Sequence, residues 1–365
     1  MTLSGAQGTP FPGMDDGIRA AIEATNRAGG IAGRKIVIGN VLDDGGNPNT
    51  NTDQVHKAVE QDKVFAVFMT SNAAQQQSTD YLKANKVPFF GWAYLPNYCE
   101  NTWGFGWNGC VDATHSTDSS IPDSLAAAVG KKASQLKFAV QGADDAASAG
   151  STTLVADKFK ARGGNVVYTD TSIPGATQTT DYSPYVQRIL AKSPDVVYVS
   201  ANFQNVVGLT GALIAAGYKG VVANGVGYVP GLLEKSPDVA KGLEGAYIYN
   251  SVPAAEEGTP AIQQMKANVK AINKPVNLTL GLSVGYWSAD MFTQMLQAVG
   301  KDLTADNFST KINGGFTTTP PKGGPCPVTF AADHLKSAGG AGVEQVKGGK
   351  YVVSVPFKCY PQMTQ

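Results

Sequence analysis

A group of polar residues follows one of the most apolar segments of the chain. The run Val64–Met69 reads as a buried strand, and Thr70-Ser71-Asn72 comes directly after it, before the next expected helix. Hydroxyl groups and free backbone N–H groups at a helix start suit an anion such as a carboxylate, because the helix dipole is positive there. The alternative is an ordinary helix N-cap, a position that Ser, Thr and Asn favour for local reasons.

Other residues that could contact a ligand stand after later apolar runs. Gly91-Trp92-Ala93-Tyr94 ends the next expected strand, where Trp92 and Tyr94 could form a flat apolar wall or simply pack within a loop. Asp144-Asp145 follows a strand in the second half of the chain, and it could pair with a ligand cation or cap the next helix. Tyr228 and Tyr286 are further candidates, with core packing as the alternative.

One motif is typical of an enzyme. Gly281-Leu282-Ser283-Val284-Gly285 matches the GxSxG nucleophile elbow of α/β-hydrolases, and His334 and several aspartates follow it. The elbow requires a buried strand immediately before the serine, but Pro275 and Asn277 interrupt the short run that precedes Ser283. We therefore expect a loop that leads into a helix, and a protein that is not an enzyme. A serine hydrolase that uses Ser283 is kept as an alternative.

The four cysteines indicate disulfide bonds. Cys99 and Cys110 bracket a loop rich in Trp and Gly, and Cys326 and Cys359 bracket the C-terminal tail. Four cysteines allow three pairings, and we favour these two because each would link the ends of a segment with little regular pattern. Disulfides persist in an oxidising compartment, and four reduced thiols are the alternative. With no CxxC motif and three histidines, we expect no metal site.

The N-terminal sequence MTLSGAQGTP lacks the basic and apolar regions of a signal peptide. Together with the cysteines, this favours a mature protein whose signal segment is absent from this sequence over a cytosolic protein. We expect a periplasmic or other extracytoplasmic location, either free or lipid-anchored.

Composition excludes several classes of partner. The chain has 365 residues, enough for two domains, and 42% of them are hydrophobic. Lys and Arg number 29 and Asp and Glu number 29, so the net charge is zero. This balance disfavours binding to nucleic acid or to anionic lipid, both of which need excess positive charge. No apolar run approaches the ~20 residues of a membrane span.

Strands and helices alternate along the chain, which indicates an α/β fold with parallel sheets. Helices are expected at 18–28, 51–62, 73–85, 124–129, 151–161, 182–191, 204–216, 260–272 and 282–299. Strands are expected at 35–42, 64–69, 87–92, 136–141, 165–170, 195–201, 220–223, 245–252 and 351–355. Two successive series of this kind predict two doubly wound parallel-sheet lobes.

The sequence resembles the type I periplasmic solute-binding family, in particular the Leu/Ile/Val-binding proteins of ABC importers. The resemblance covers nearly all of the chain up to about residue 317. The stretches that carry it are LSGAQG (3–8), AIEATNRAGGIAGRKI (21–36), DDGGNP (43–48), VFAVFMTSNAAQQQSTDYLKANKVPFF (64–90) and, more loosely, SPDVVYVSANF and VGYWSADMFTQMLQAVG in the second half.

This resemblance implies two lobes joined by a multi-strand hinge, with a ligand cleft between them. We expect one lobe at 1–118 plus 252–322 and the other at 119–251 plus 323–365. The implied function is capture of a small molecule by lobe closure and its delivery to a membrane permease. We expect a monomer that needs no cofactor and binds no nucleic acid. A ligand-sensing ectodomain is the alternative binding protein.

The resemblance also implies roles for particular residues. Gly91-Trp92-Ala93-Tyr94 lies where the family donates hydrogen bonds to a ligand carboxylate, and Asn202-Phe203 matches a ligand-contact position. Asn224 lies where amino-acid-binding members carry a glutamate for the ligand ammonium. An amide cannot supply that charge, and a buried ammonium without a counter-charge costs several kcal/mol. We therefore favour an organic acid with an apolar or aromatic body. A branched-chain or other amino acid comes next, with Asp144 or Asp145 as the counter-charge.

Overall fold

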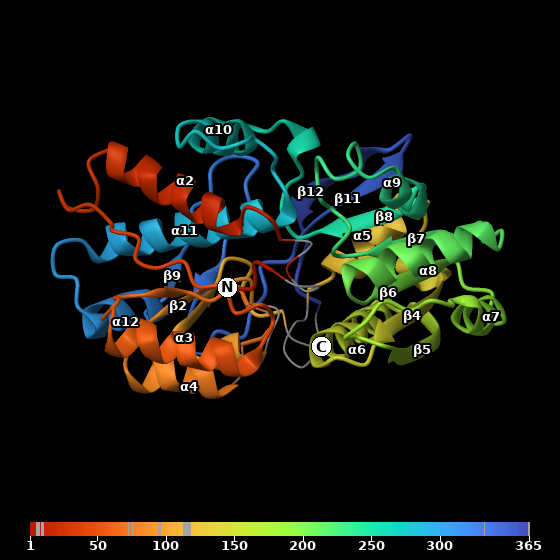
Figure 1. The fold of residues 1–365 in the computed structure, drawn as a ribbon, viewed down its shortest axis with the longest axis horizontal. Helices are drawn as coiled ribbons and strands as arrows, with labels where there is room; N and C mark the ends of the chain where they lie inside the picture. Colours follow the sequence, from red (N-terminus) through yellow and green to blue (C-terminus); the bar gives the residue numbers. More distant parts are fainter. Residues whose placement is uncertain are drawn as a thin grey trace. The chain divides into compact units, whose positions relative to one another are not determined.

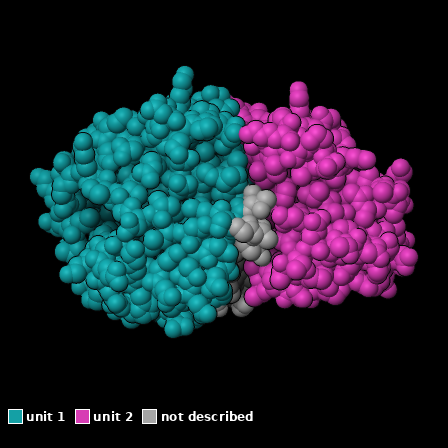
Figure 2. Space-filling view, viewed as in Figure 1, with its two compact units in different colours: residues 1–115, 259–338 teal, residues 116–258, 339–365 magenta. Residues whose placement is uncertain are grey.

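The chain folds into two compact units. The computed structural model describes residues 1–4, 8, 11–71, 73–74, 76–93, 96–111, 118–331 and 333–363. Unit 1 consists of residues 1–115 and 259–338, and unit 2 of residues 116–258 and 339–365 (Figure 2). The chain therefore passes from one unit to the other three times.

Unit 1 has a small parallel sheet with helices on both sides (Figure 1). In this sheet, β1 (Val67–Phe68) pairs with β2 (Phe89–Gly91), and β2 pairs with β3 (Gly104–Gly106). A second, antiparallel pair consists of β9 (Phe316–Thr317) and β10 (Thr329–Phe330). The helices of the unit are α2 (Met14–Arg27), α3 (Pro48–Glu60), α4 (Gln76–Ala84), α10 (Pro260–Lys270), α11 (Leu280–Val299), α12 (Ala305–Asn313) and the 3-10 helix η1 (Pro96–Tyr98).

Aromatic rings fill the interior of unit 1. Phe90 and Phe105, from neighbouring strands, are fully buried, and their ring centroids lie 5.4 Å apart. Phe308 of α12 meets the Phe105 ring edge-on at 5.6 Å. Such offset and edge-to-face contacts are favourable beyond the apolar area they bury. They hold the short strands β2 and β3 against a helix that follows far later in the sequence.

Helices α2 and α11 cross closely because glycines face each other's backbone. A Cβ atom on Gly17 would lie 2.1 Å from the carbonyl oxygen of Leu282, and one on Gly285 would lie 2.0 Å from that of Met14. Neither position tolerates a side chain without moving a helix. Gly285 belongs to the GxSxG motif, so this glycine serves helix packing.

The strand predicted at 35–42 is wrong. In the described part of the chain, no backbone N–H of residues 37–41 donates to another backbone group, so these residues form no ladder. The prediction rested on the apolar and β-branched residues of this segment, which indicate only that its side chains suit a strand. A strand also needs a neighbour with which to pair. Of the other two strands predicted in this half, 64–69 shortens to the two residues of β1, and 87–92 shortens to the three residues of β2.

Unit 2 is built on a seven-stranded sheet with the order β12-β11-β8-β7-β6-β4-β5. The strands from β8 to β5 run parallel, and β11 pairs antiparallel with both β8 and β12. The strands are β4 (Lys137–Ala143), β5 (Asn165–Ile173), β6 (Val196–Ser200), β7 (Val221–Asn224), β8 (Tyr247–Asn250), β11 (Gly340–Lys347) and β12 (Lys350–Cys359).

Helices connect the parallel strands of unit 2. They are α6 (Ala146–Ala161), α7 (Ser183–Leu190), α8 (Phe203–Ala215) and α9 (Pro237–Leu243). Before the first of these strands come α5 (Ser120–Val129) and the 3-10 helix η2 (Ala133–Gln135), and the 3-10 helix η3 (Ala255–Glu257) follows β8. An ion pair of 2.6 Å between Lys158 of α6 and Asp118 is almost completely buried. Because removing one partner would leave an uncompensated charge inside the unit, this pair holds the segment before α5 in place.

Several short elements were not predicted: β3, β9, β10, α9 and α12, together with the longer strand β11. Most lie in glycine- or proline-rich stretches, where short apolar runs carry little periodicity. Among the described residues, no helix combines the length and the hydropathy that a membrane crossing requires.

Candidate functional site

The described polar residues after β1 differ in whether unit 1 supplies them with partners. The Ser71 hydroxyl donates to Asp44 Oδ2 at 2.5 Å and accepts from the backbone N–H of Ala73 at 3.0 Å. Thr70 is buried, and its hydroxyl oxygen has no partner among the described residues. Of this predicted group, Ser71 is thus engaged by Asp44, and Thr70 keeps a buried hydroxyl that pairs with no described residue. Asn72 lies outside the described residues.

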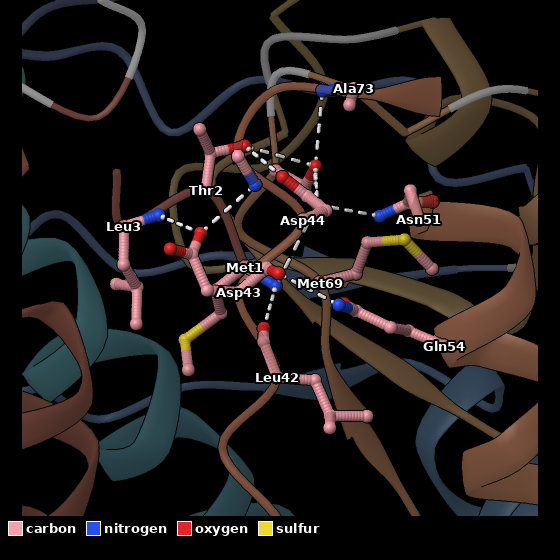
Figure 3. Close-up of polar contacts among 12 residues, drawn as sticks. Met1, Thr2, Leu3, Leu42, Asp43, Asp44, Asn51, Gln54, Met69 and Ala73 are labelled. Carbon is pink, nitrogen blue, oxygen red and sulfur yellow. Dashed lines mark hydrogen bonds and ion pairs between the residues drawn. The ribbon is translucent and has the colours of Figure 1, made fainter. Parts of the chain in front are cut away.

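Asp44, which was not among the predicted site residues, is the centre of this cluster (Figure 3). Its carboxylate also accepts from Thr2 Oγ1 at 2.7 Å and from Asn51 Nδ2 at 2.9 Å. Burial alone would raise its pKa, but the Met1 ammonium and the donated hydrogen bonds outweigh burial and lower the pKa. Asp44 is therefore held as a carboxylate that orients Ser71. The adjacent acidic residues Asp43 and Asp44 before Gly45 are the feature of the sequence that could have indicated this cluster.

The residues after β2 are packed tightly. A Cβ atom on Gly91 would lie 2.6 Å from the Tyr98 hydroxyl, which donates to the carbonyl of Met69 at 2.7 Å. The N–H of Ala93 donates to Asn108 Oδ1 at 3.2 Å. Trp92 is half-buried and meets the Phe11 ring edge-on at 6.0 Å. The backbone of Ala93 is thus already paired, and Tyr94 lies outside the described residues.

The topology of unit 2 places polar residues at one point of the sheet edge. Strands β5 and β6 lie on opposite sides of β4, so the chain reverses its winding direction there. In such sheets, ligands bind outside the carboxyl ends of the strands at this switch point. Asp144-Asp145 follows β4, and Asn202-Phe203 follows β6.

Both aspartates are engaged by the backbone. Asp144 is exposed, and its Oδ1 accepts from the N–H of Gly175 at 2.7 Å. Asp145 is the N-cap of α6, where its Oδ1 accepts from the N–H of Ser148 at 2.9 Å. Its second oxygen, Oδ2, is buried and has no partner among the described residues. The predicted capping role therefore accounts for Oδ1 of Asp145 and leaves Oδ2 without a partner among the described residues.

Asn202 is likewise a helix cap. Its Oδ1 accepts from the N–H of Asn205 at 2.9 Å, and its Nδ2 donates to the carbonyl of Gly175 at 2.9 Å. Asn205 is fully buried, and the Tyr182 hydroxyl donates to its Oδ1 at 2.8 Å. Phe203 is buried beside them. Asn202 and Asn205 therefore hold the loop after β5 against the start of α8. The residue type of Asn205 alone does not reveal this role.

Asn224 ends β7 and is fully buried. Its Oδ1 accepts from the N–H groups of Val226 at 3.1 Å and Gly227 at 2.7 Å. These two donors fix the orientation of the amide, because both require the oxygen on their side. The amide nitrogen, Nδ2, has no partner in the described part of the chain. Asn224 therefore offers a hydrogen-bond donor at the carboxyl end of a central strand.

The two candidate tyrosines lie in the cores of their units. Tyr228 is fully buried; its hydroxyl donates to Glu256 Oε2 at 2.6 Å and accepts from the N–H of Ala255. Tyr286 lies within α11, where its hydroxyl accepts from Asn268 Nδ2 at 2.8 Å. Burial raises the pKa of Tyr286 to about 12. Both hydroxyls have protein partners, as the core alternative expects.

The predicted pairing of Cys99 with Cys110 is confirmed. Cys326 and Cys359 are also disulfide-bonded, and the described residues include no free cysteine. Within the same residues, no group of three or more His, Cys, Asp or Glu side chains could hold a metal ion.

The GxSxG motif forms no nucleophile elbow. Ser283 lies in the first turns of α11, with its N–H donating to the carbonyl of Thr279, and it is almost completely buried. His334 pairs instead with the Gly104 carbonyl at 2.8 Å and with Asn313 Oδ1 at 2.6 Å. The strand–turn–helix geometry that exposes a nucleophile is therefore absent at Ser283.

The chain belongs to the periplasmic binding protein family, whose sequence model matches residues 1–350. This confirms the resemblance to the type I, Leu/Ile/Val-binding-like proteins and the prediction of an α/β fold with two lobes. No curated protein matches the chain.

Solved structures share this fold across nearly the whole chain. A solute-binding protein of an ABC transporter from Rhodopseudomonas palustris BisB5, in complex with 3,4-dihydroxybenzoic acid, is 18% identical, with a TM-score of 0.73 and coverage of 100% of this chain and 96% of that one. A branched-chain amino acid ABC transporter protein from Thermus thermophilus with bound valine is 15% identical, with a TM-score of 0.75 and coverage of 98% and 94%. A substrate-binding protein from Aeropyrum pernix is 16% identical, with a TM-score of 0.79 and coverage of 99% and 95%.

Proposed function

We propose that this protein is the extracytoplasmic substrate-binding protein of an ABC importer. It captures a small carboxylate-bearing solute in a cleft between its lobes, closes on it by a hinge motion, and delivers it to a membrane permease. An apolar or aromatic organic acid is the favoured ligand, and a branched-chain or other amino acid comes next. Family membership and relatives of the same fold that hold 3,4-dihydroxybenzoic acid and valine support this role.

The amide nitrogen of Asn224, which has no partner among the described residues, is the observation that carries the choice of an organic acid. A buried N–H donor without a partner costs about 1–3 kcal/mol, and a ligand oxygen would satisfy it. A carboxylate or carbonyl oxygen can accept this hydrogen bond, whereas an ammonium group cannot. The hydroxyl of Thr70 in unit 1 also has no partner in the described part of the chain, and it can likewise donate to an anion.

The competing ligand class depends on the acidic residues after β4. Asp144 is exposed and Asp145 Oδ2 has no partner within the described residues, so both could face an ammonium group. An amino acid would use them as counter-charge, and an organic acid would not. Substitution of Asp144 or Asp145 should therefore weaken the binding of an amino acid and leave the binding of an organic acid unchanged.

A substitution at Asn224 tests this assignment. Asn224→Asp keeps an oxygen to accept from Val226 and Gly227 but replaces the free donor with a negative oxygen. Thermal-shift screening of benzoic, hydroxybenzoic and branched aliphatic acids against valine and leucine identifies the ligand class, and calorimetry then measures the affinity. We expect an aromatic or aliphatic acid to stabilise the protein most and Asn224→Asp to weaken its binding about ten- to hundredfold.

Asp144→Asn is the matched control, because an amide oxygen can still accept from Gly175. We expect it to leave the affinity for the acid unchanged. If valine or leucine gives the largest shift and Asp144→Asn or Asp145→Asn removes it, the ligand is an amino acid. If no carboxylate-bearing solute binds, the proposed role as a carboxylate carrier is wrong.

A further inference from the structure

The carboxyl edge of the small sheet in unit 1 holds three buried hydrogen-bond donors that pair with no described residue. They are the Thr70 hydroxyl, the indole nitrogen Nε1 of Trp107 and the amide nitrogen Nδ2 of Asn108. Thr70 follows β1, and the other two residues follow β3. Thr70 and Asn108 are each 5% exposed, and Trp107 is 3% exposed. Because buried polar groups are normally hydrogen-bonded, three such donors at one sheet edge require an explanation.

All three residues border the short stretch of chain that ends β2. A Cβ atom on Gly91 would lie 3.2 Å from Cγ2 of Thr70. On the other side, the Trp107 N–H donates to the Gly91 carbonyl at 3.2 Å, which continues the parallel ladder between β2 and β3. Asn108 Oδ1 accepts from the Ala93 N–H at 3.2 Å. The three donors therefore come from two segments that flank residues 91–93.

The Asn108 amide has a fixed orientation. The Ala93 N–H is a donor, so the side-chain atom that faces it must be the oxygen Oδ1. The nitrogen Nδ2 then lies on the other side of the amide group, where no described residue accepts a hydrogen bond from it. Asn108 therefore satisfies the backbone after β2 and presents a donor of its own.

The turn from Gly106 to Gly109 holds the two donors after β3 in place. The Gly109 N–H closes this turn by donating to the Gly106 carbonyl at 2.9 Å. The disulfide bond of Cys110 anchors the turn on one side. The Ala338 N–H anchors it on another by donating to the Asn108 carbonyl at 2.7 Å. Because the turn is fixed in advance, a ligand that uses its donors loses little affinity to ordering of the chain.

The chemistry of the three groups suits a carboxylate. An indole N–H and an amide nitrogen only donate hydrogen bonds, and a hydroxyl can donate as well. A carboxylate only accepts, and its two oxygens offer about four acceptor sites, whereas an ammonium group could pair with the hydroxyl alone. Because all three donors are neutral, they can surround a carboxylate without adding a second buried charge.

We propose that Trp107 and Asn108 bind the carboxylate group of the solute together with Thr70. Trp107 and Asn108 were not among the predicted site residues. This inference rests on the proposed function, because it takes the solute to be a carboxylate-bearing acid, and it names the groups of unit 1 that recognise the acid end. The primary amide of the same acid should bind more weakly, because its own N–H groups would meet donors.

The indole N–H signal of Trp107 tests the contact directly. The chain has four tryptophans, so an NMR spectrum of protein with isotope-labelled tryptophan shows few signals, and the signal lost in Trp107→Phe is that of Trp107. The probes are benzoate, hydroxybenzoate and isovalerate. We expect the acid that binds most tightly to shift the Trp107 indole proton downfield, because it then donates to a charged oxygen. The Trp103 signal should change less.

Two substitutions test the contribution of the donors to affinity. Trp107→Phe keeps an aromatic ring and removes the N–H, and Asn108→Asp keeps an oxygen for Ala93 but replaces the donor with a negative oxygen. We expect calorimetry to show that each weakens binding of the acid about ten- to hundredfold. Trp103→Phe is the matched control, because Trp103 is half-buried in the same disulfide-closed loop, and it should leave the affinity unchanged.

The outcomes separate this inference from the proposed function. If an acid binds the unmodified chain but the Trp107 signal stays in place and both variants keep full affinity, the inference is wrong and the proposed function stands. If the variants weaken the acid and its primary amide equally, these donors do not recognise the carboxylate, and the inference is also wrong. If no acid binds the unmodified chain, both fail. Should a variant not fold, the indole signal of the unmodified chain decides.

Discussion

Glu344 of β11 meets Asn250 of β8 inside unit 2. Glu344 is fully buried, and Asn250 Nδ2 donates to one of its carboxyl oxygens. The other carboxyl oxygen and Asn250 Oδ1 have no partner among the described residues. Burial raises the pKa of Glu344 well above its usual value, and Glu257 and Glu256 raise it further. Once protonated, Glu344 can donate to Asn250, so that acid and amide satisfy each other.

This pairing predicts a pH dependence of stability. Because the pKa of Glu344 is higher in the folded state, the unfolded chain ionises first as pH rises above about 4.5. Stability from this group is therefore fully present below that pH and falls as pH increases towards the folded-state pKa. In the Glu344→Gln variant, the amide supplies a donor and an acceptor at the same place but does not titrate. We expect it to raise the free energy of unfolding by about 1–3 kcal/mol at pH 8 and to have little effect at pH 4.

Urea unfolding at both pH values measures this difference. Glu234→Gln, at an exposed position of the same unit, is the control and should leave stability unchanged at either pH. If Glu344→Gln destabilises the protein equally at pH 4 and pH 8, the effect of Glu344 does not depend on its protonation, and this prediction is wrong.

Among the elements, the loop closed by Cys99 and Cys110 contains a whole strand, β3. β3 has three residues and pairs with β2 along a single edge. So short a strand gains little from its own ladder. The disulfide restricts the unfolded chain on both sides of β3 and so favours its pairing.

Removing this disulfide should destabilise unit 1. The sequence separation of 11 residues corresponds to about 3 kcal/mol of chain entropy, so we expect Cys99→Ala with Cys110→Ala to lower the free energy of unfolding by about that amount. Urea unfolding followed by tryptophan fluorescence measures it. Trp103 and Trp107 lie inside the loop and report on unit 1. An unchanged midpoint would mean that packing around Phe105 holds β3 without the covalent link.

At the scale of the whole molecule, the proposed function requires a change of shape on binding. A compact chain of this length has a radius of gyration of about 21 Å. We expect the acid found by screening to lower that radius by a few per cent in small-angle scattering, because a ligand that contacts both lobes favours the closed state. Asn224→Asp should need a higher ligand concentration for the same change. A radius that stays constant at saturation would contradict capture by hinged closure.

Periodicity and apolar runs were sufficient to predict most of the architecture. The strand predicted at 195–201 is β6, and the helix predicted at 260–272 is α10. The alternation also placed Asp144 and Asn202 at strand ends, and parallel strands bring such ends to one edge. These inferences succeed because side-chain pattern and chain direction are local properties that are written in the sequence.

The partners of those residues were decided by tertiary structure. Ser71 donates to Asp44, and Asn202 donates to Gly175, so two predicted ligand contacts hold loops together. The segment 35–42 has the composition of a strand but forms no strand ladder with any described residue. Hydrogen bonds of this kind join residues that are far apart in the chain. Residue type and spacing therefore determined where polar groups gather in this protein, and only the folded backbone determined which of their atoms are paired with one another among the described residues.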